Sequence, residues 1–247
     1  MINEALLKEG ERFDDLERNG YHIIQNPEKF CFGMDAVLLS GFVKAKKGQR
    51  VLDMCTGTGI IAILVAAKTE CGKITAVEIQ EESADMAARS VLTNELTDRI
   101  EIINDDIKNC TERFGKHSFD VVTCNPPYMS AGKGLTNPRD AKAVARHEIL
   151  CDLSDVIKTA AEVLKVSGHF YMVHRPGRLL DIVQECAKNG LEIKRLKFVQ
   201  PFADKKPNMV LIDAVKGGGR ELTVEEPIIV FKSPGIYSDY IKDTYGY

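Results

Sequence analysis

Short apolar runs and helical segments alternate along the chain from residue 50 onward. Arg50–Met54, Ile74–Glu78 and Ile100–Asn104 predict strands, whereas Ile60–Lys68 and Glu81–Asn94 have the apolar spacing of helices. Such an alternation is typical of a parallel sheet that is covered by helices on both faces. The middle of the chain therefore predicts an α/β fold.

The alternation continues for one more round and then changes. Phe119–Cys124 and His169–His174 predict strands, and we expect helices over Leu153–Leu164 and Arg178–Asn189. Three further strand-like segments follow, with no convincing helix between the last two: Ile193–Phe198, Met209–Val215 and Ile228–Phe231. We expect this part of the chain to form an antiparallel hairpin that closes one edge of the sheet.

The two ends of the chain are interpreted as additions to one core. Residues 1–45 are expected to be a lead-in that packs on the core, and residues 193–247 to be the hairpin and a tail. Within the lead-in, residues 30–39 predict a turn that enters a helix, with Asp35 as a candidate N-cap. At 247 residues the chain can bury one large core, so we expect a single domain over 1–247.

Composition narrows the class of protein. Charged residues make up 28% and hydrophobic residues 44%, the balance of a soluble globular protein. No apolar run reaches the roughly 18 residues that cross a bilayer, and the first residues lack the pattern of a signal peptide, which predicts a cytoplasmic protein. The seven cysteines include no C-x-x-C pair, and the five histidines show no metal-ligand spacing. We therefore predict neither a disulfide framework nor a metal site.

A glycine-rich turn follows the first strand of the α/β region. Gly57 and Gly59 allow a tight turn against which a bulky ligand can lie. Asp53 precedes them, and Glu78 ends the next strand, where an acid can accept hydrogen bonds from a ribose diol. A pyrophosphate favours a complete G-x-G-x-x-G and no nearby carboxylate, whereas Asp53 can pair with an amino-acid ammonium group. This favours S-adenosylmethionine over a dinucleotide and leaves an NAD-dependent oxidoreductase as an alternative.

Two acids follow the third strand of this region. Asp106 is expected to accept a hydrogen bond from the adenine amine of the cofactor, and Asp105 to cap the next helix.

Asn125-Pro126-Pro127-Tyr128 follows the fourth strand, at the sheet edge where ligands bind in open α/β folds. The prolines stiffen the turn and leave the Pro126 carbonyl without a local partner. The side-chain carbonyl of Asn125 is a second acceptor, and Tyr128 adds an aromatic ring. The motif therefore predicts a site that holds a planar amine.

These motifs resemble those of class I S-adenosylmethionine-dependent methyltransferases that act on amino groups. Residues 30–39, Arg146-His147-Glu148 and Lys216-Gly217-Gly218 extend the resemblance to the bacterial tRNA(Val) adenine N6-methyltransferase family. The resemblance implies a Rossmann-like fold with a mostly parallel seven-stranded sheet, and methylation of the tRNA adenine just 3′ of the anticodon.

The resemblance also implies roles for individual residues. In the catalytic loop, Asn125 and the Pro126 carbonyl would accept from the adenine amine, with Pro127 stiffening the turn and Tyr128 stacking on the base. It places cofactor contacts at Asp35, Asp53, Cys55, Thr56, Gly57, Gly59, Glu78, Ile79, Asp106, Ile107 and Asn125.

An RNA partner carries negative phosphates, and the net charge of this chain is also negative. The net charge of −3 and pI near 6.0 are not the bulk signature of a nucleic-acid-binding protein. A local set of basic residues is nevertheless available to bind tRNA phosphates: Lys133, Arg139, Lys142, Arg146, Arg175, Lys205 and Lys206. Arg146-His147-Glu148 has the alternative role of bracing the catalytic loop. We expect a monomer or a weak homodimer that binds no membrane.

Other functions stay open at this point. A protein glutamine N5-methyltransferase would use the same loop on a planar carboxamide, although about 49 residues before the glycine motif leave little room for a helical substrate domain. A DNA adenine methyltransferase is disfavoured because no sizeable target-recognition domain is present. A non-catalytic RNA-folding factor that retains the site is a further alternative.

Overall fold

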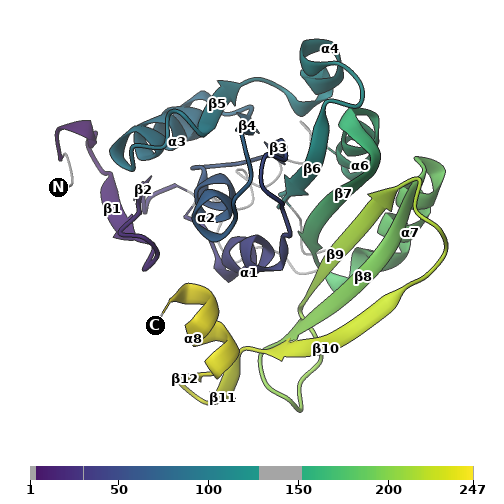
Figure 1. Ribbon diagram of the computed structural model, residues 1–247. Coiled ribbons are helices and arrows are strands. Elements are labelled where there is room, and N and C mark those ends of the chain that lie inside the picture. Colours follow the sequence, from purple (N-terminus) through teal and green to yellow (C-terminus); the bar gives the residue numbers. More distant parts are fainter. Residues whose placement is uncertain (1–3, 30, 128–151, 247) are drawn as a thin grey trace.

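A computed structural model describes residues 4–29, 31–127 and 152–246 of the chain. Its centre is an eight-stranded sheet in the order β10-β8-β9-β7-β6-β3-β4-β5 (Figure 1). The strands are β3 (Val51–Met54), β4 (Ile74–Glu78), β5 (Ile100–Asn104), β6 (Phe119–Cys124), β7 (Leu164–His174), β8 (Leu191–Gln200), β9 (Met209–Lys216) and β10 (Thr223–Ile229). Strands β5, β4, β3, β6 and β7 pair in parallel, which confirms the expected α/β architecture.

Helices cover both faces of this sheet. One face carries α1 (Met34–Phe42), α2 (Ile60–Lys68) and α3 (Glu81–Thr93), and the other carries α4 (Cys110–Phe114), α6 (Leu153–Val163) and α7 (Leu179–Lys188). Short 3₁₀ turns η2 (Ile107–Asn109) and η3 (Pro176–Arg178) precede α4 and α7. Every residue of β3 is buried, including Asp53, because a central parallel strand is covered by helices on both faces.

The C-terminal strands differ from the expected hairpin. β9 is antiparallel to both of its neighbours, β7 and β8, so no side of β9 is left for the next strand. β10 instead pairs in parallel with the outer side of β8, with Thr223 opposite Arg195. The predicted antiparallel character is correct for β8 and β9 and wrong for β10, which adds an eighth strand to the seven expected.

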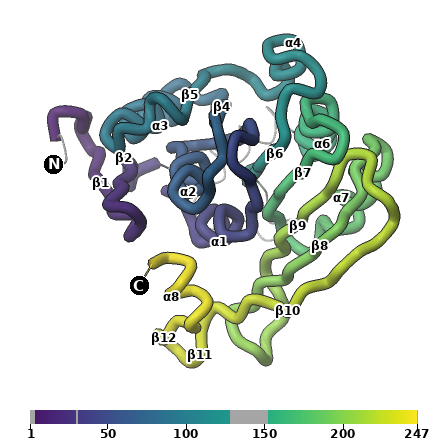
Figure 2. Tube along the Cα trace, in the orientation of Figure 1, coloured from purple at the N-terminus to yellow at the C-terminus, as the bar shows by residue number. Residues whose placement is uncertain are grey.

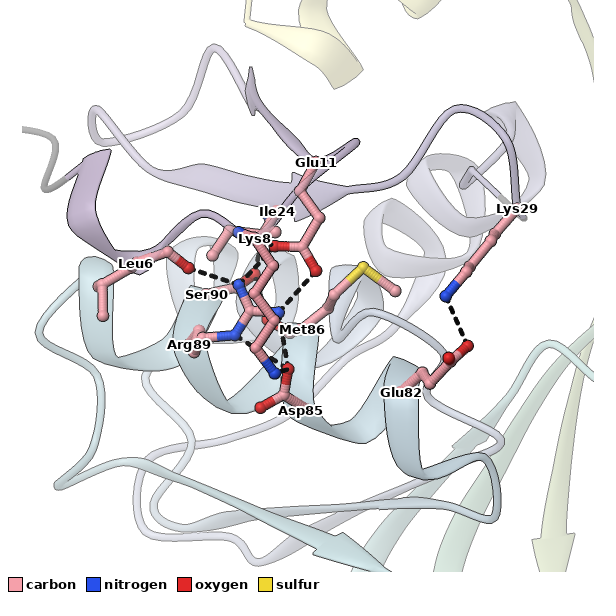
Figure 3. Close-up of polar contacts among 10 residues, drawn as sticks. All are labelled: Leu6, Lys8, Glu11, Ile24, Lys29, Glu82, Asp85, Met86, Arg89 and Ser90. Carbon is pink, nitrogen blue, oxygen red and sulfur yellow. Dashed lines mark hydrogen bonds and ion pairs between the residues drawn. The ribbon is translucent and has the colours of Figure 1, made fainter.

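The N-terminal segment contains elements that the apolar pattern did not predict. After a 3₁₀ turn, η1 (Glu4–Leu6), strands β1 (Arg12–Asp15) and β2 (His22–Gln25) form an antiparallel hairpin. The hairpin lies along α3, where the hydroxyl of Ser90 accepts from the Ile24 N–H at 2.9 Å. Figure 3 shows the Arg89 side chain of α3 reaching Glu11, Asp85 and the Leu6 carbonyl. The lead-in is thus bound to the helix that follows β4.

The C-terminal end returns to the same region of the molecule. The small hairpin of β11 (Phe231–Ser233) and β12 (Ile236–Tyr237) leads into α8 (Asp239–Tyr245), which packs on α1 through the fully buried Ile241. The Arg18 guanidinium donates to the Asp243 carbonyl and joins α8 to the β1–β2 turn. Figure 2 shows β1 and β2 beside α3, and α8 below α1.

Candidate functional site

The carboxyl ends of β3, β4 and β6 meet at one edge of the sheet. The register pairs Met54 with Val77 on one side and with Cys124 on the other. Glu78 and Asn125, which follow these partners, therefore lie at the same level of the edge, separated by the glycine turn. This is the edge at which ligands bind in open α/β sheets.

The glycine turn depends on backbone conformations that favour glycine. Gly57 and Gly59 have φ angles of 59° and 91°. A Cβ atom at Gly59 would lie 3.2 Å from the Cβ atom of Ala87, so the turn packs closely on α3. At Gly57 no atom of the described residues lies within 4 Å of the Cβ position, which leaves the backbone open to a ligand. Cys55 also has a positive φ of 56°, a conformation that is uncommon outside turns and functional sites.

Asp53 is fully buried and accepts from two hydroxyl groups. Its Oδ2 accepts from Thr56 Oγ1 at 2.5 Å, and its Oδ1 accepts from Thr123 Oγ1 at 2.6 Å. Burial raises the pKa of Asp53 to about 6, against the lowering effect of the two hydroxyls and with a smaller raising effect from Glu78. Both carboxylate oxygens thus accept hydrogen bonds from protein groups. We expected Asp53 to face the ammonium group of the cofactor, whereas the structure places it inside the sheet.

Thr123 is a residue that the sequence reasoning missed. It ties β6 to Asp53, and its signal was a hydroxyl residue in the buried end of a mostly apolar strand, two positions before Asn125. Because the hydrogen bond crosses from β6 to β3, it connects the asparagine loop to the glycine turn through one buried carboxylate.

Glu78 also binds the glycine turn. Its Oε2 accepts from the Gly57 N–H at 2.9 Å and its Oε1 from the Gln80 N–H at 3.0 Å. Oε1 also accepts a longer bond from Gln80 Nε2 at 3.4 Å, so Oε2 retains one lone pair and a second hydroxyl of a diol would have to replace the Gln80 amide. Asn104, which was also missed, donates to the Glu78 and Ile79 carbonyls at 2.9 and 3.1 Å. It holds the end of β4 beside the end of β5.

The two acids after β5 have the opposite capping roles to those expected. Asp106 is the N-cap of η2, because its Oδ1 accepts from the Lys108 N–H at 2.9 Å. Asp105 instead accepts from the Asp106 N–H and from Asn109 Nδ2, both at 2.8 Å. The assignment of the cap to Asp105 is therefore wrong, since η2 begins at the buried Ile107, one residue after Asp106.

Asn125 carries an unusual amide group. Its Nδ2 donates to Asp35 Oδ2 at 3.1 Å, whereas its Oδ1 is buried and has no hydrogen-bond partner among the described residues. A buried acceptor without a donor destabilises a protein by about 1–3 kcal/mol, so such atoms are rare unless a ligand supplies the donor. Pro126 is buried and Pro127 half-buried in the turn that follows, and Tyr128 lies outside the described residues.

Asp35 lies in the first turn of α1 and does not cap it. The N-cap is Gly33, because helical geometry begins at Met34. The expected capping role of Asp35 is therefore wrong. An acidic side chain in the first turn still interacts favourably with the helix dipole.

Three of the expected RNA-binding residues lie on one side of the sheet edge. Arg175 follows β7, and its Nη1 donates to the Asn208 carbonyl at 3.2 Å. Lys205 and Lys206 are exposed on the loop between β8 and β9. Since β9 is antiparallel to β7, this loop lies beside the carboxyl end of β7. The other four expected residues lie outside the described residues: Lys133, Arg139, Lys142 and Arg146.

Two searches of the described residues gave no result. Residues 4–29, 31–127 and 152–246 contain no group of three or more His, Cys, Asp or Glu side chains that could hold a metal ion. Within the same ranges, no helix is long and apolar enough to span a membrane.

Comparison with protein families gives the class of the chain. Residues 30–181 match the family model of the methyltransferase small domain, a range that includes Asp35, the glycine turn and the asparagine loop. The chain belongs to this family. The protein is thus an S-adenosylmethionine-dependent methyltransferase, and the choice of this cofactor over a dinucleotide is confirmed.

Several relatives of this methyltransferase are named as tRNA-modifying enzymes. A tRNA1(Val) (adenine(37)-N6)-methyltransferase of a Flavobacteriaceae bacterium is 28% identical over 91% of this chain and 94% of the relative. An enzyme of the same name from Tolumonas auensis is 28% identical over 78% of this chain and 79% of its own. Among solved structures, a predicted O-methyltransferase from Agrobacterium tumefaciens has a TM-score of 0.68 at 24% identity and covers 86% of this chain and 95% of its own. That likeness supports the methyltransferase fold.

Proposed function

We propose that this methyltransferase methylates the N6 amine of an unpaired adenine in tRNA, at the position just 3′ of the anticodon of tRNA(Val). Relatives that cover 91% of the chain are named as tRNA1(Val) (adenine(37)-N6)-methyltransferases, which supports this substrate. The observation that carries the proposal is the buried Oδ1 of Asn125, which lacks a donor among the described residues at the sheet edge.

An adenine amine can supply the missing donor. In the proposed complex, one N–H of the amine donates to Asn125 Oδ1 and the other to the Pro126 carbonyl, while Tyr128 stacks on the base. These two acceptors draw electron density toward nitrogen and hold its lone pair in line with the methyl donor. Positioning of this kind is worth roughly 7–11 kcal/mol in well-oriented reactions.

The bound cofactor supplies an electrophilic sulfonium methyl group. As the nitrogen–carbon bond forms, the carbon–sulfur bond breaks, and its electron pair leaves with S-adenosylhomocysteine. The methylated amine then loses a proton to water. Since the proton leaves after the transfer, no general base with a shifted pKa is needed from the protein.

The residues around the glycine turn fit the cofactor. In this proposal Glu78 accepts from the ribose hydroxyls, one at the unused lone pair of Oε2 and one at Oε1 in place of the Gln80 side-chain amide. The open backbone at Gly57 gives room for the cofactor to lie against the turn. Asp106, next to the buried Ile107, accepts from the adenine amine. Further proposed contacts come from Cys55, Thr56, Gly59 and Ile79.

The RNA is proposed to approach over the carboxyl edge. Arg175, Lys205 and Lys206 would bind phosphates beside the end of β7, which predicts that affinity falls with salt. An anticodon-loop adenine is already unpaired, so turning it toward the edge requires little energy. Residues 1–247 would act as one methyltransferase domain, with the lead-in and the C-terminal strands bound to its core.

The test is methyl transfer to a synthetic tRNA(Val) anticodon stem-loop with labelled S-adenosylmethionine, followed by nucleoside mass spectrometry. We expect N6-methyladenosine at the position 3′ of the anticodon. A matched stem-loop with purine riboside at that position lacks the amine and should accept no label. Label in a glutamine-containing release-factor protein, with none in RNA, would contradict the proposal and favour the glutamine methyltransferase.

A further inference from the structure

We propose that Asp35 is a positioning residue that orients the amide of Asn125, so that Oδ1 and not Nδ2 faces the substrate amine. The inference rests on the proposed function for the identity of that amine. It gives Asp35 a role different from the cofactor contact that the family resemblance implied.

The contact itself sets the direction of the amide. Asn125 Nδ2 donates to Asp35 Oδ2 at 3.1 Å, and the opposite end of the amide is the buried Oδ1, which accepts no hydrogen bond from the part of the chain that the structure describes. A carboxylate accepts hydrogen bonds and donates none. A flipped amide would place Oδ1 against the carboxylate, two acceptors in contact, and would present an N–H₂ donor to an amine that needs an acceptor.

Two features of the chain hold the carboxylate of Asp35 in place. Its Oδ1 accepts from the Ala36 N–H at 3.0 Å, in the first turn of α1. A Cβ atom at Gly33 would lie 2.7 Å from the same oxygen, closer than packed atoms allow. Because the φ angle of Gly33 is −106°, glycine is needed there for space and not for backbone freedom.

The segment before α1 is also tied down. The side chain of Gln25 is buried at the end of β2, and its Oε1 accepts from the Phe32 N–H at 2.8 Å. The same side chain donates through Nε2 to Asp14 of β1 at 2.7 Å. The N-terminal hairpin thus anchors the chain two residues before the start of α1, and through α1 it places Asp35 beside β6.

A positioning role and a cofactor role predict different kinetics. If Asp35 orients Asn125, Asp35→Asn should lower kcat about tenfold, since its own amide can pair with either orientation of Asn125. The Kd of S-adenosylhomocysteine should stay within about twofold of the wild-type value, because no cofactor contact is lost. A cofactor role predicts the reverse: the Kd of S-adenosylhomocysteine should rise, and kcat should be retained at saturating cofactor. That result would overturn the proposal.

The exchange variant makes the test more specific. Asn125→Asp alone places two carboxylates in contact, whereas Asp35→Asn/Asn125→Asp restores a donor at position 35 and an acceptor at position 125. The double variant should be at least about tenfold more active than Asn125→Asp. Equal activity of the two would show that the pair does not act as a unit. Gly33→Ala is a further variant, which keeps Asp35 but displaces its carboxylate. Like Asp35→Asn, it should lower kcat.

A spectroscopic readout separates this inference from the proposed function. In protein labelled with ¹⁵N-asparagine, the side-chain amide signal of Asn125 is assigned by its loss in Asn125→Ala. We expect Asp35→Asn to shift this signal in the presence of S-adenosylhomocysteine. Binding of S-adenosylhomocysteine also shows that the variant is folded. An unchanged signal would overturn the positioning role whatever the substrate is. A shifted signal in a protein that methylates no RNA would instead refute the tRNA assignment and leave the positioning role intact.

Discussion

At the ends of β3 and β4 the carboxylates of Asp53 and Glu78 already accept hydrogen bonds from the protein, whereas at the end of β6 the buried Oδ1 of Asn125 accepts none from the described residues. The cofactor half of the edge, the part around Asp53 and Glu78 that we propose binds the cofactor, is therefore held in shape by its own acids. The target half, the part around Asn125 that we propose binds the substrate, keeps the buried Oδ1 without a donor from the described residues, and a substrate N–H would supply one.

This difference indicates which polar residues shape the site and which face a ligand. Asp53 joins the glycine turn to β6 from inside the sheet, so we interpret it as a structural acid. Asn125 has one end held by Asp35, and its other end receives no donor from the described residues, which is the geometry that the proposed substrate contact requires. Preorganised groups stabilise a transition state without the energy of reorganisation at the moment of reaction.

The largest effect is expected from removal of the unpartnered acceptor. Asn125→Ala should lower kcat by about 10²–10³-fold, the range seen when one preorganised transition-state hydrogen bond is lost. The Kd of S-adenosylhomocysteine, measured by calorimetry, should change little. Asn189→Ala is a matched control, because this amide lies at the end of α7 and donates there to the Glu185 backbone carbonyl. Retention of wild-type turnover in Asn125→Ala would contradict the role of the target half.

The second test concerns the ion pair between Arg89 of α3 and Glu11 of the N-terminal segment, which lies away from the sheet edge. The side chains of Arg89 and Glu11 are only 12% and 8% exposed, so Arg89→Ala should lower the free energy of unfolding by about 3 kcal/mol, because it leaves the buried Glu11 carboxylate without its charged partner and with only the Lys8 N–H among the described residues. Lys8→Ala is the control: its partner Asp85 is bound across an exposed contact, and we expect a loss of about 0.5 kcal/mol or less. Urea denaturation followed by circular dichroism measures both values. Equal losses would show that the N-terminal segment adds no specific support to α3.

Asp53 gives the third test, through pH. Its folded-state pKa is raised from 3.8 to about 6, so the native state holds a proton that the unfolded chain releases. The contribution of Asp53 to stability is therefore greatest at low pH and is lost as pH rises from about 4 to about 6, by roughly 1.4 kcal/mol per pKa unit. Asp53→Asn should remove this slope.

The measurement is the difference in unfolding free energy between the wild type and Asp53→Asn at several pH values. The difference is needed because buried His174, whose pKa is lowered to about 4, opposes the slope of Asp53: it destabilises the native state as pH falls below 6.5. His174 is common to both proteins and cancels. A difference that does not change between pH 4 and pH 7 would contradict a buried, proton-holding Asp53.

The strands of the central region were predictable because each is a short run dominated by apolar residues, even the edge strand β5, in which Glu101 and Asn104 are exposed. Ile74–Glu78, Ile100–Asn104 and Phe119–Cys124 were predicted with the observed bounds. Strands β1 and β2 were missed, because four-residue strands such as Arg12–Asp15 carry too few apolar residues to give a period. The pairing of β10 was predicted wrongly, because pairing depends on which strand edge is free, and no local pattern contains that information.

The sequence by itself determined the order of strands and helices in the centre of the fold, the glycine turn, and the acids and the asparagine at the strand ends, since each of these depends on local composition and spacing. Only the tertiary structure decided which polar atoms pair. Asn125 meets Asp35 across 90 positions of the chain, and Thr123 meets Asp53 across 70. The physical reason is that burial and hydrogen bonding depend on what lies opposite a side chain in space, which is set by the register and packing of the whole sheet.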